Sequence, residues 1–164
     1  MIPEKSIILL SGIPATGKST FGRYLSRKHQ FAYYDLECHP RGWPHPEFKP
    51  TWDDSRSDFV AMLRRHHDRT ALDWGFPPEC LPWVNQLQAQ GVRLIWFSGD
   101  LDCARRVFEQ RGGIDPHRFD DQIRKIRDAE FPELLDCVVV EALPASGVFL
   151  DMTQIERIVF QRGD

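Results

Sequence analysis

Hydrophobic residues along the chain fall into short apolar runs that alternate with segments of helical spacing. The clearest runs, 6–11 and 92–97, are long enough for buried strands, whereas Phe21, Tyr24 and Leu25 recur on one face of a helix. The strands expected are about 6–11, 31–34, 70–74, 92–97, 138–140 and 148–150, and the helices expected are about 18–29, 54–67, 78–89, 101–111, 116–129 and 153–160. This alternation predicts the α/β fold class, with a parallel sheet and helices on both faces.

One segment departs from this regular alternation. Residues 39–53 contain four prolines, which predict neither a regular helix nor a central strand. Trp43 and Trp52 lie in this segment, where we expect them to be available to a ligand. The five tryptophans of the chain are too widely spaced in the sequence to predict a stacking platform.

A phosphate-binding motif follows the first expected strand. Residues 12–19 read Gly-Ile-Pro-Ala-Thr-Gly-Lys-Ser and match the pattern G-x-x-x-x-G-K-[ST] at every fixed position. The glycines allow a tight loop whose N–H groups face phosphate oxygens, and the helix behind the loop adds its positive end. The motif predicts Lys18 at the β- and γ-phosphates and the Ser19 hydroxyl on Mg²⁺. The nucleotide-binding residues predicted are Gly12, Pro14, Ala15, Thr16, Gly17, Lys18, Ser19 and Thr20.

Other polar residues follow the later strands and helices. Asp73 ends an apolar run, as does the carboxylate that holds Mg²⁺ in many nucleotide-binding proteins, so we predict it as a second metal residue. The segment from 101 to 119 is rich in arginine and contains a Gly112-Gly113 turn, which is typical of a lid. Its arginines would stabilise charge on a transferred phosphoryl group, with Arg111 the first candidate and Arg105 and Arg106 the next.

Length, charge and cysteine content narrow the class of protein. A chain of 164 residues favours one domain, and a net charge of −3 disfavours binding to nucleic acid through overall charge. The apolar runs are too short for a membrane span, and the first strand begins too early for a signal peptide. The four cysteines form no C-x-x-C pair, so reduced thiols in a cytoplasmic monomer or homodimer are the simplest expectation.

Missing motifs exclude several classes of nucleotide-binding protein. The chain has a single asparagine, Asn85, followed by Gln86, so the N-K-x-D motif that recognises guanine is absent and adenine is expected instead. No D-x-x-G motif and no L-S-G-G-Q-like transporter signature occurs. What remains are the smallest proteins in which the phosphate-binding loop, an acceptor-binding segment and a lid share one domain.

In this layout the chain resembles the small P-loop kinases of the gluconate, shikimate and adenylylsulfate kinase type. It also resembles predicted ATP-binding kinases related to zeta toxins and chloramphenicol phosphotransferase, whose third-strand signature is similar to Leu72-Asp73-Trp74-Gly75-Phe76. The resemblance implies a three-layer P-loop NTPase fold over residues 1–164, with an acceptor-binding segment at about 36–54 and a lid at about 105–119. It also implies transfer of the γ-phosphoryl group of ATP, with Mg²⁺, to a hydroxyl or phosphate of a small molecule.

The resemblance further implies roles for individual residues. Asp35, at the end of the second strand, would orient or deprotonate the acceptor, and Glu37 could share that role. The lid arginines of these families usually stand four residues apart, whereas Arg106 and Arg111 are five apart, so either Arg105 or Arg106 is the partner of Arg111. Two alternatives stay open: a regulatory module that binds ATP or ADP, and a nucleotide hydrolase without an acceptor.

Overall fold

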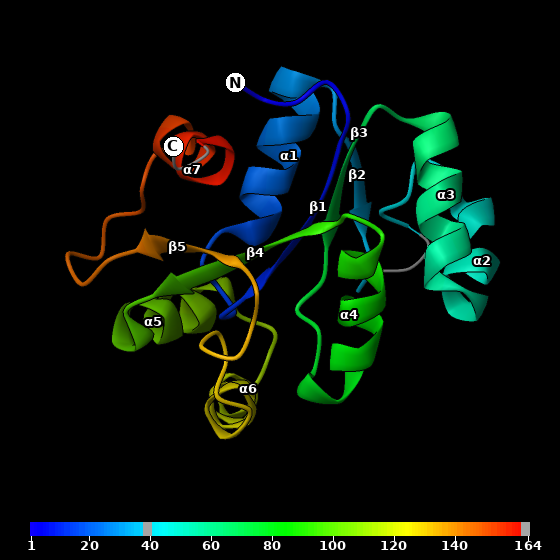
Figure 1. The fold of residues 1–164 in the computed structure, drawn as a ribbon. Helices are drawn as coiled ribbons and strands as arrows, with labels where there is room; N and C mark the ends of the chain where they lie inside the picture. Colours follow the sequence, from blue (N-terminus) through cyan, green and yellow to red (C-terminus); the bar gives the residue numbers. More distant parts are fainter. Residues whose placement is uncertain (38–40, 162–164) are drawn as a thin grey trace.

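The described strands form one parallel sheet with the phosphate-binding motif at its centre (Figure 1). The computed structural model describes residues 1–37 and 41–161. Its strands are β1 (Ser6–Gly12), β2 (Ala32–Asp35), β3 (Arg69–Asp73), β4 (Arg93–Gly99) and β5 (Val138–Leu143), in the spatial order β2-β3-β1-β4-β5. Each neighbouring pair is parallel. The predicted α/β class is therefore confirmed. The phosphate-binding motif begins at the end of β1, which lies between β3 and β4. At this point the strand order reverses, and open α/β sheets bind ligands at such points.

Helices cover both faces of the sheet and one of its ends. On one face lie α1 (Lys18–His29) and α7 (Met152–Phe160), and on the other lie α3 (Arg56–His66) and α4 (Leu81–Ala89) (Figure 1). The remaining helices are α2 (Lys49–Asp54), α5 (Leu101–Arg111) and α6 (His117–Asp128), with two 3₁₀ turns, η1 (Pro46–Phe48) and η2 (Pro78–Cys80). Phe108 of α5 and Phe119 of α6 share a buried cluster with Ile13 and Ala15, so both helices lie against the phosphate-binding loop.

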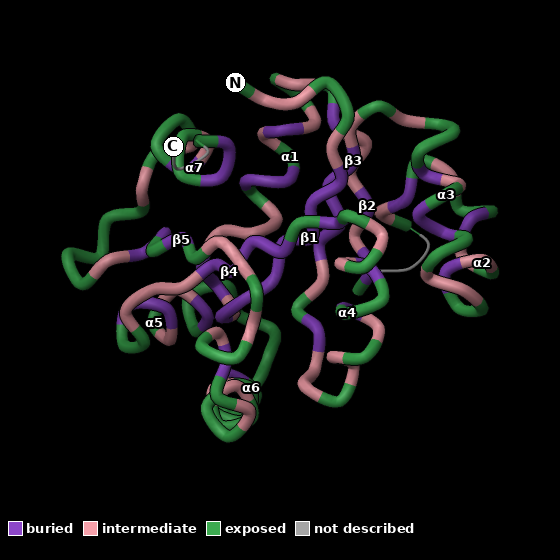
Figure 2. Tube along the Cα trace, in the orientation of Figure 1, coloured by how far each residue is buried: buried purple, intermediate pink, exposed green. Residues whose placement is uncertain are grey.

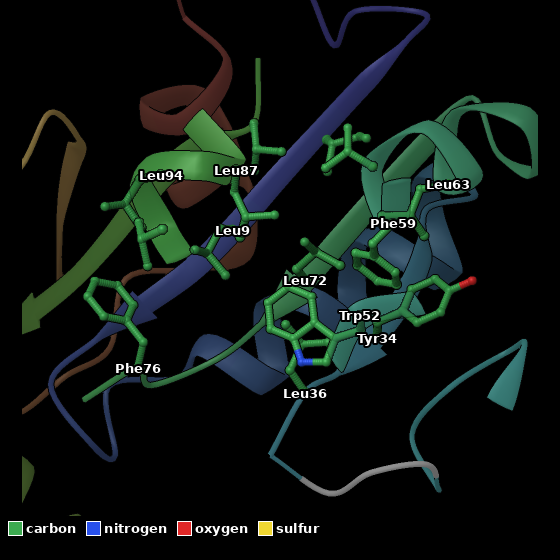
Figure 3. Close-up of a cluster of buried hydrophobic side chains, with 14 of the residues drawn as sticks. Leu9, Tyr34, Leu36, Trp52, Phe59, Leu63, Leu72, Phe76, Leu87 and Leu94 are labelled. Atoms are coloured by element: carbon green, nitrogen blue, oxygen red, sulfur yellow. The ribbon is translucent and has the colours of Figure 1, made fainter. Parts of the chain in front are cut away.

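The buried core holds the central strand on both faces (Figure 2). Ile7 and Leu9 belong to the cluster beneath α3 and α4, part of which Figure 3 shows, whereas Ile8 and Leu10 belong to the cluster beneath α1 and α7. All four are at most 7% exposed, which explains why β1 reads as a continuous apolar run. Complete burial of each such side chain contributes about 1.5–3 kcal/mol, so the strand that carries the loop is firmly fixed.

The proline-rich segment differs from its prediction. Its first residues, 39 and 40, lie outside the described residues, but its second half contains η1 and the helix α2, so the prediction of no helix was wrong there. Pro46 and Pro50 occupy the first turn of their helices, where a backbone N–H has no partner within the helix in any case. Counting prolines was therefore misleading, because their position within the helix decides whether they break it.

The tryptophans and the final expected strand also differ from prediction. Trp43 and Trp52 are only 5% and 3% exposed, so they belong to the core and are not available to a ligand. Trp52, Trp74 and Trp83 gather with ring centroids 5.5–6.3 Å apart, although they are far apart in the sequence. Residues 148–150 form no strand. Within the described residues, one backbone hydrogen bond joins them to β5, from Leu150 N–H to Ala142 O at 2.9 Å.

None of the helices within residues 1–37 and 41–161 combines the length and apolar character needed to cross a bilayer. Cys80, Cys103 and Cys137 are free thiols, whereas Cys38 lies outside the described residues.

Candidate active site

The loop that follows β1 closes into a compact cradle. Gly12, Ala15 and Gly17 adopt positive φ angles of 130°, 62° and 92°. Within the loop, Thr16 Oγ1 donates to the carbonyl oxygen of Ile13 at 2.7 Å, and Lys18 Nζ donates to the same oxygen at 3.1 Å. The helix α1 starts directly behind the loop with no side-chain cap and no acidic residue in its first turn. Its N–H groups and positive end are therefore available to an anion such as a phosphate.

Gly12 is a position where only glycine fits. A Cβ atom built there would lie 2.1 Å from the backbone oxygen of Phe97 on β4, and φ is already positive. We expect Gly12→Ala to lower the free energy of unfolding by about 3 kcal/mol or more, or about 6–12 °C in melting temperature for a domain of this size. Gly113→Ala is the matched control, because φ is also positive but no atom lies within 4 Å. Equal melting temperatures for the two variants would contradict the steric explanation.

Ser19 and Asp73, the two predicted metal residues, are brought into contact. The Ser19 hydroxyl donates to Asp73 Oδ2 at 2.6 Å, and the carboxylate is almost fully buried, with 3% of the residue exposed. The contact forms because Asp73 ends β3 opposite Leu10, next to the strand that leads into the loop. One hydroxyl and one carboxylate, together with phosphate oxygens and waters, suit the hard, oxygen-preferring Mg²⁺ ion. Among the described residues there is no larger His, Cys, Asp and Glu cluster that could hold a metal.

A third side chain, missed in the sequence, reaches the same carboxylate. The Tyr33 hydroxyl donates a very short hydrogen bond to Asp73 Oδ2. Burial, followed by the charge of Asp73, raises the pKa of Tyr33 far above its ordinary value, so the hydroxyl remains a donor at neutral pH. No motif marks Tyr33 as functional, because its contact depends on how β2 pairs with β3.

Two further carboxylates lie at the ends of β2 and β3. Asp35 pairs with Asp73 across the two strands, and its Oδ1 accepts the backbone N–H of Glu37 at 3.0 Å. Glu37 Oε1 accepts the backbone N–H of Gly75 at 2.8 Å, which folds the carboxylate back over the end of β3. Although Glu37 as a residue is exposed, burial of its carboxylate raises its pKa, against the opposing effects of the Gly75 N–H and the Lys18 charge.

The charges of several of these residues act on Lys18. Burial lowers the pKa of its ammonium group, and the charges of Asp73 and Glu37 oppose that shift. The charge of Arg111 at the end of α5 lowers the same pKa further. Lys18 therefore lies within electrostatic range of Asp73, Glu37 and Arg111.

The three candidate lid arginines have different surroundings. Arg105 Nε and Nη2 donate to the two oxygens of Asp120 at 3.0 and 3.1 Å, and Nη1 pairs with Glu109, so Arg105 ties α5 to α6. Arg106 Nη2 donates to the sulfur of Cys103 at 3.2 Å. Arg111 is exposed, and it is the arginine of the three whose charge acts on Lys18. Arg111 therefore lies within electrostatic range of Lys18, whereas Arg105 is held in ion pairs between α5 and α6.

This difference predicts different effects of replacing Arg105 and Arg111. We expect Arg111→Ala to lower kcat by about 10- to 10²-fold with an unchanged melting temperature, because a charge that stabilises the transition state is lost. Arg105→Ala is expected to change kcat less than tenfold while lowering the melting temperature by at most a few degrees, because exposed ion pairs contribute little to stability. Steady-state kinetics and thermal melts check both, and a larger kcat loss in Arg105→Ala would reverse the assignment.

The segment after β5 lies against the other end of the phosphate loop. A Cβ atom at Gly17 would lie 3.7 Å from the ring of Phe149, and Cys103 Sγ donates to the carbonyl oxygen of Ala145 at 3.8 Å. Phe149 and Val148 are 39% and 70% exposed, so this short apolar segment is open to solvent where Phe149 meets the loop. The sequence pattern predicted a strand at this point, so it gave no signal for the contact of this segment with the phosphate loop.

Comparisons with known proteins support the fold. Neither the protein-family models nor the curated proteins include a match to this sequence. Among solved structures, a gluconokinase from Sinorhizobium meliloti 1021 has a TM-score of 0.59 at 14% identity, covering 96% of this chain and 91% of that chain. A shikimate kinase from Bacteroides thetaiotaomicron has a TM-score of 0.57 at 19% identity, with 94% of each chain covered. A sugar kinase from Janibacter sp. HTCC2649 has a TM-score of 0.64 at 14% identity, with 93% and 91% covered. The chain therefore has the fold of the small P-loop kinases, over nearly its whole length.

Proposed function

We propose that this protein transfers the γ-phosphoryl group of Mg·ATP to a hydroxyl or phosphate of a small molecule. The observation that carries the proposal is the set of charges around Lys18: Asp73, which contacts Ser19, together with Glu37 and Arg111. A module that only binds nucleotide needs the loop, but it has no use for a second carboxylate within electrostatic range of the loop lysine. The gluconokinase, shikimate kinase and deoxyadenosine kinase neighbours share this fold and support the same class of reaction.

Each residue has a defined role in the proposal. The loop N–H groups and Lys18 bind the β- and γ-phosphates, and Ser19 with Asp73 would hold Mg²⁺, which supplies charge neutralisation when bound. An acceptor oxygen forms a bond to the γ-phosphorus as the bond to the β-γ bridging oxygen breaks, which releases ADP. For a hydroxyl acceptor, the proton passes to a carboxylate. We assign that proton to Glu37, whose carboxylate is folded over the end of β3 by its hydrogen bond to Gly75, and we place Asp35 beside Asp73 in support.

The surroundings of the loop suggest where the other parts of the substrates bind. Phe149 lies beside Gly17, and the segment that carries it contacts Cys103, which binds Arg106, so we propose this side of the loop for the adenine base. A cavity of about 570 Å³ opens at Ile13 on the loop, with Gly99, Arg127 and Phe131 in its lining, and this volume is typical of small-molecule sites. A hollow of similar size between α2 and α3 has no loop residue in its lining. The proposal includes a cytoplasmic location, where ATP is supplied and thiols stay reduced.

ADP release from Mg·ATP tests the proposal, measured alone and with sugar acids, nucleosides, nucleotides and antibiotics as acceptors. We expect one acceptor class to raise the rate at least tenfold. Release that is independent of every acceptor would favour a hydrolase. Calorimetric ATP binding without release would favour a regulatory module.

A further inference from the structure

One hydrogen bond at the metal residues has no role in the mechanism given so far. Asp73 Oδ2 accepts from two hydroxyls, those of Ser19 and Tyr33. Ser19 is a ligand in the proposed magnesium site, but Tyr33 is on β2, which is separated from the phosphate-loop strand by β3. Its contact with Asp73, at the end of the neighbouring strand β3, therefore comes from a strand that carries no part of the phosphate-binding motif.

The surrounding residues are shaped to admit the Tyr33 ring. Tyr33 pairs with Ala71 of β3, two residues before Asp73, so a small side chain lies beside it in the sheet. On α1, a Cβ atom at Gly22 would lie 2.4 Å from the ring. Glycine inside a helix costs about 1 kcal/mol relative to alanine, so α1 gives up helical stability at the position where the ring passes.

We propose that Tyr33 is a positioning residue that holds Asp73 in place for Mg²⁺. In the structure, the Ser19 hydroxyl donates to Asp73. A Ser19 hydroxyl that gives an oxygen lone pair to a metal ion is drawn toward that ion, whereas Tyr33 donates to the same Asp73 oxygen from outside the metal site and holds the carboxylate independently of Ser19. Hydrogen-bond partners of metal-binding carboxylates typically contribute 10- to 100-fold to metal affinity. The inference rests on the proposed function through the metal role of Asp73.

The test compares Tyr33→Phe with a matched tyrosine control. Phenylalanine keeps the ring beside Gly22 and removes only the hydroxyl. Tyr24→Phe removes another hydroxyl that donates to a carboxylate, that of Glu156 on α7 at 2.6 Å, which has no part in the proposed site. Calorimetry measures ADP binding with and without Mg²⁺, and electron paramagnetic resonance measures Mn²⁺ binding to the ADP complex; neither readout depends on catalysis.

We expect Tyr33→Phe to weaken Mn²⁺ binding about 10- to 100-fold and to reduce the gain in ADP affinity from Mg²⁺, with metal-free ADP affinity within twofold of wild type. Tyr24→Phe is expected to match wild type in both. Gly22→Ala, which displaces the ring but keeps the hydroxyl, is expected to reproduce the metal defect. Melting temperatures verify that each variant is folded.

The outcomes separate this inference from the proposed function. If Tyr33→Phe keeps the wild-type metal affinity, or loses metal-free ADP affinity to the same extent, the positioning role is overturned and the kinase proposal stands. If Mg²⁺ leaves ADP affinity unchanged even in the wild-type protein, the metal role of Asp73 fails and the inference fails with it.

Discussion

Replacing Lys18 with methionine is expected to lower kcat by about 10³-fold while the protein stays folded. In the proposed function the ammonium group of Lys18 is the donor that the loop presents to the β- and γ-phosphates, and loss of one such preorganised group typically costs 10²–10³-fold or more. Burial lowers the pKa of Lys18, so its charge is not favoured by folding, and methionine retains the volume of its stem. We therefore expect a melting temperature within a few degrees of wild type.

Lys28→Met is the control for this prediction. Lys28 lies on the same helix, and its side chain is 51% exposed beside Tyr24 and Glu156. Its replacement is expected to leave kcat unchanged. ADP release and thermal melts measure both variants. If Lys18→Met retained more than a tenth of wild-type turnover, the proposed role of the loop lysine in phosphoryl transfer would be contradicted.

Replacing Glu37 with glutamine is the second change with a large expected effect. General bases contribute about 10²–10⁴-fold, so we expect kcat to fall about 10³-fold with ATP affinity within twofold of wild type. The prediction also concerns pH. Burial raises the pKa of Glu37 above its ordinary value of 4.5, and the base is active only when deprotonated. The rate with a hydroxyl acceptor should therefore fall as pH drops through this raised pKa, and Glu37→Gln should lose that acid limb.

Two other variants decide between the acceptor-side carboxylates. Asp35→Asn is expected to lower kcat less than Glu37→Gln and to retain the acid limb. Glu79→Gln, at an exposed position in η2, is expected to change neither kcat nor its pH profile. The pH dependence of kcat, measured for all three, checks the assignment. An acid limb that disappears in Asp35→Asn and persists in Glu37→Gln would give the base role to Asp35.

The fold was predictable where local patterns were strong. The run from β1 through the glycine loop into α1 matched because the strand is buried on both faces and the motif marks the start of the helix. Residues 148–150 were mistaken for a strand because their composition suits one, yet a strand also needs a neighbour to pair with. Only Leu150 was found bonded to β5 in the described chain.

The candidate site was predictable in part. Ser19 and Asp73 meet because each follows or ends a strand at the same edge of a parallel sheet. Their positions in the sequence were therefore sufficient to predict that they lie close together. Tyr33 could not be predicted, because its contact needs both the register of β2 against β3 and the space at Gly22. The ion pair of Arg105 with Asp120 could not be predicted either, because helical spacing on α5 carries no information about the position of α6.

The fate of the γ-phosphorus tests the central claim most directly. ³¹P nuclear magnetic resonance of the protein with Mg·ATP and a stimulating acceptor distinguishes a phosphorylated acceptor from inorganic phosphate. Our account predicts that ADP and a new phosphorylated product appear in equal amounts, and that Lys18→Met forms neither at an appreciable rate. Inorganic phosphate as the sole product, formed at the same rate with and without the acceptor, would contradict phosphoryl transfer as the function.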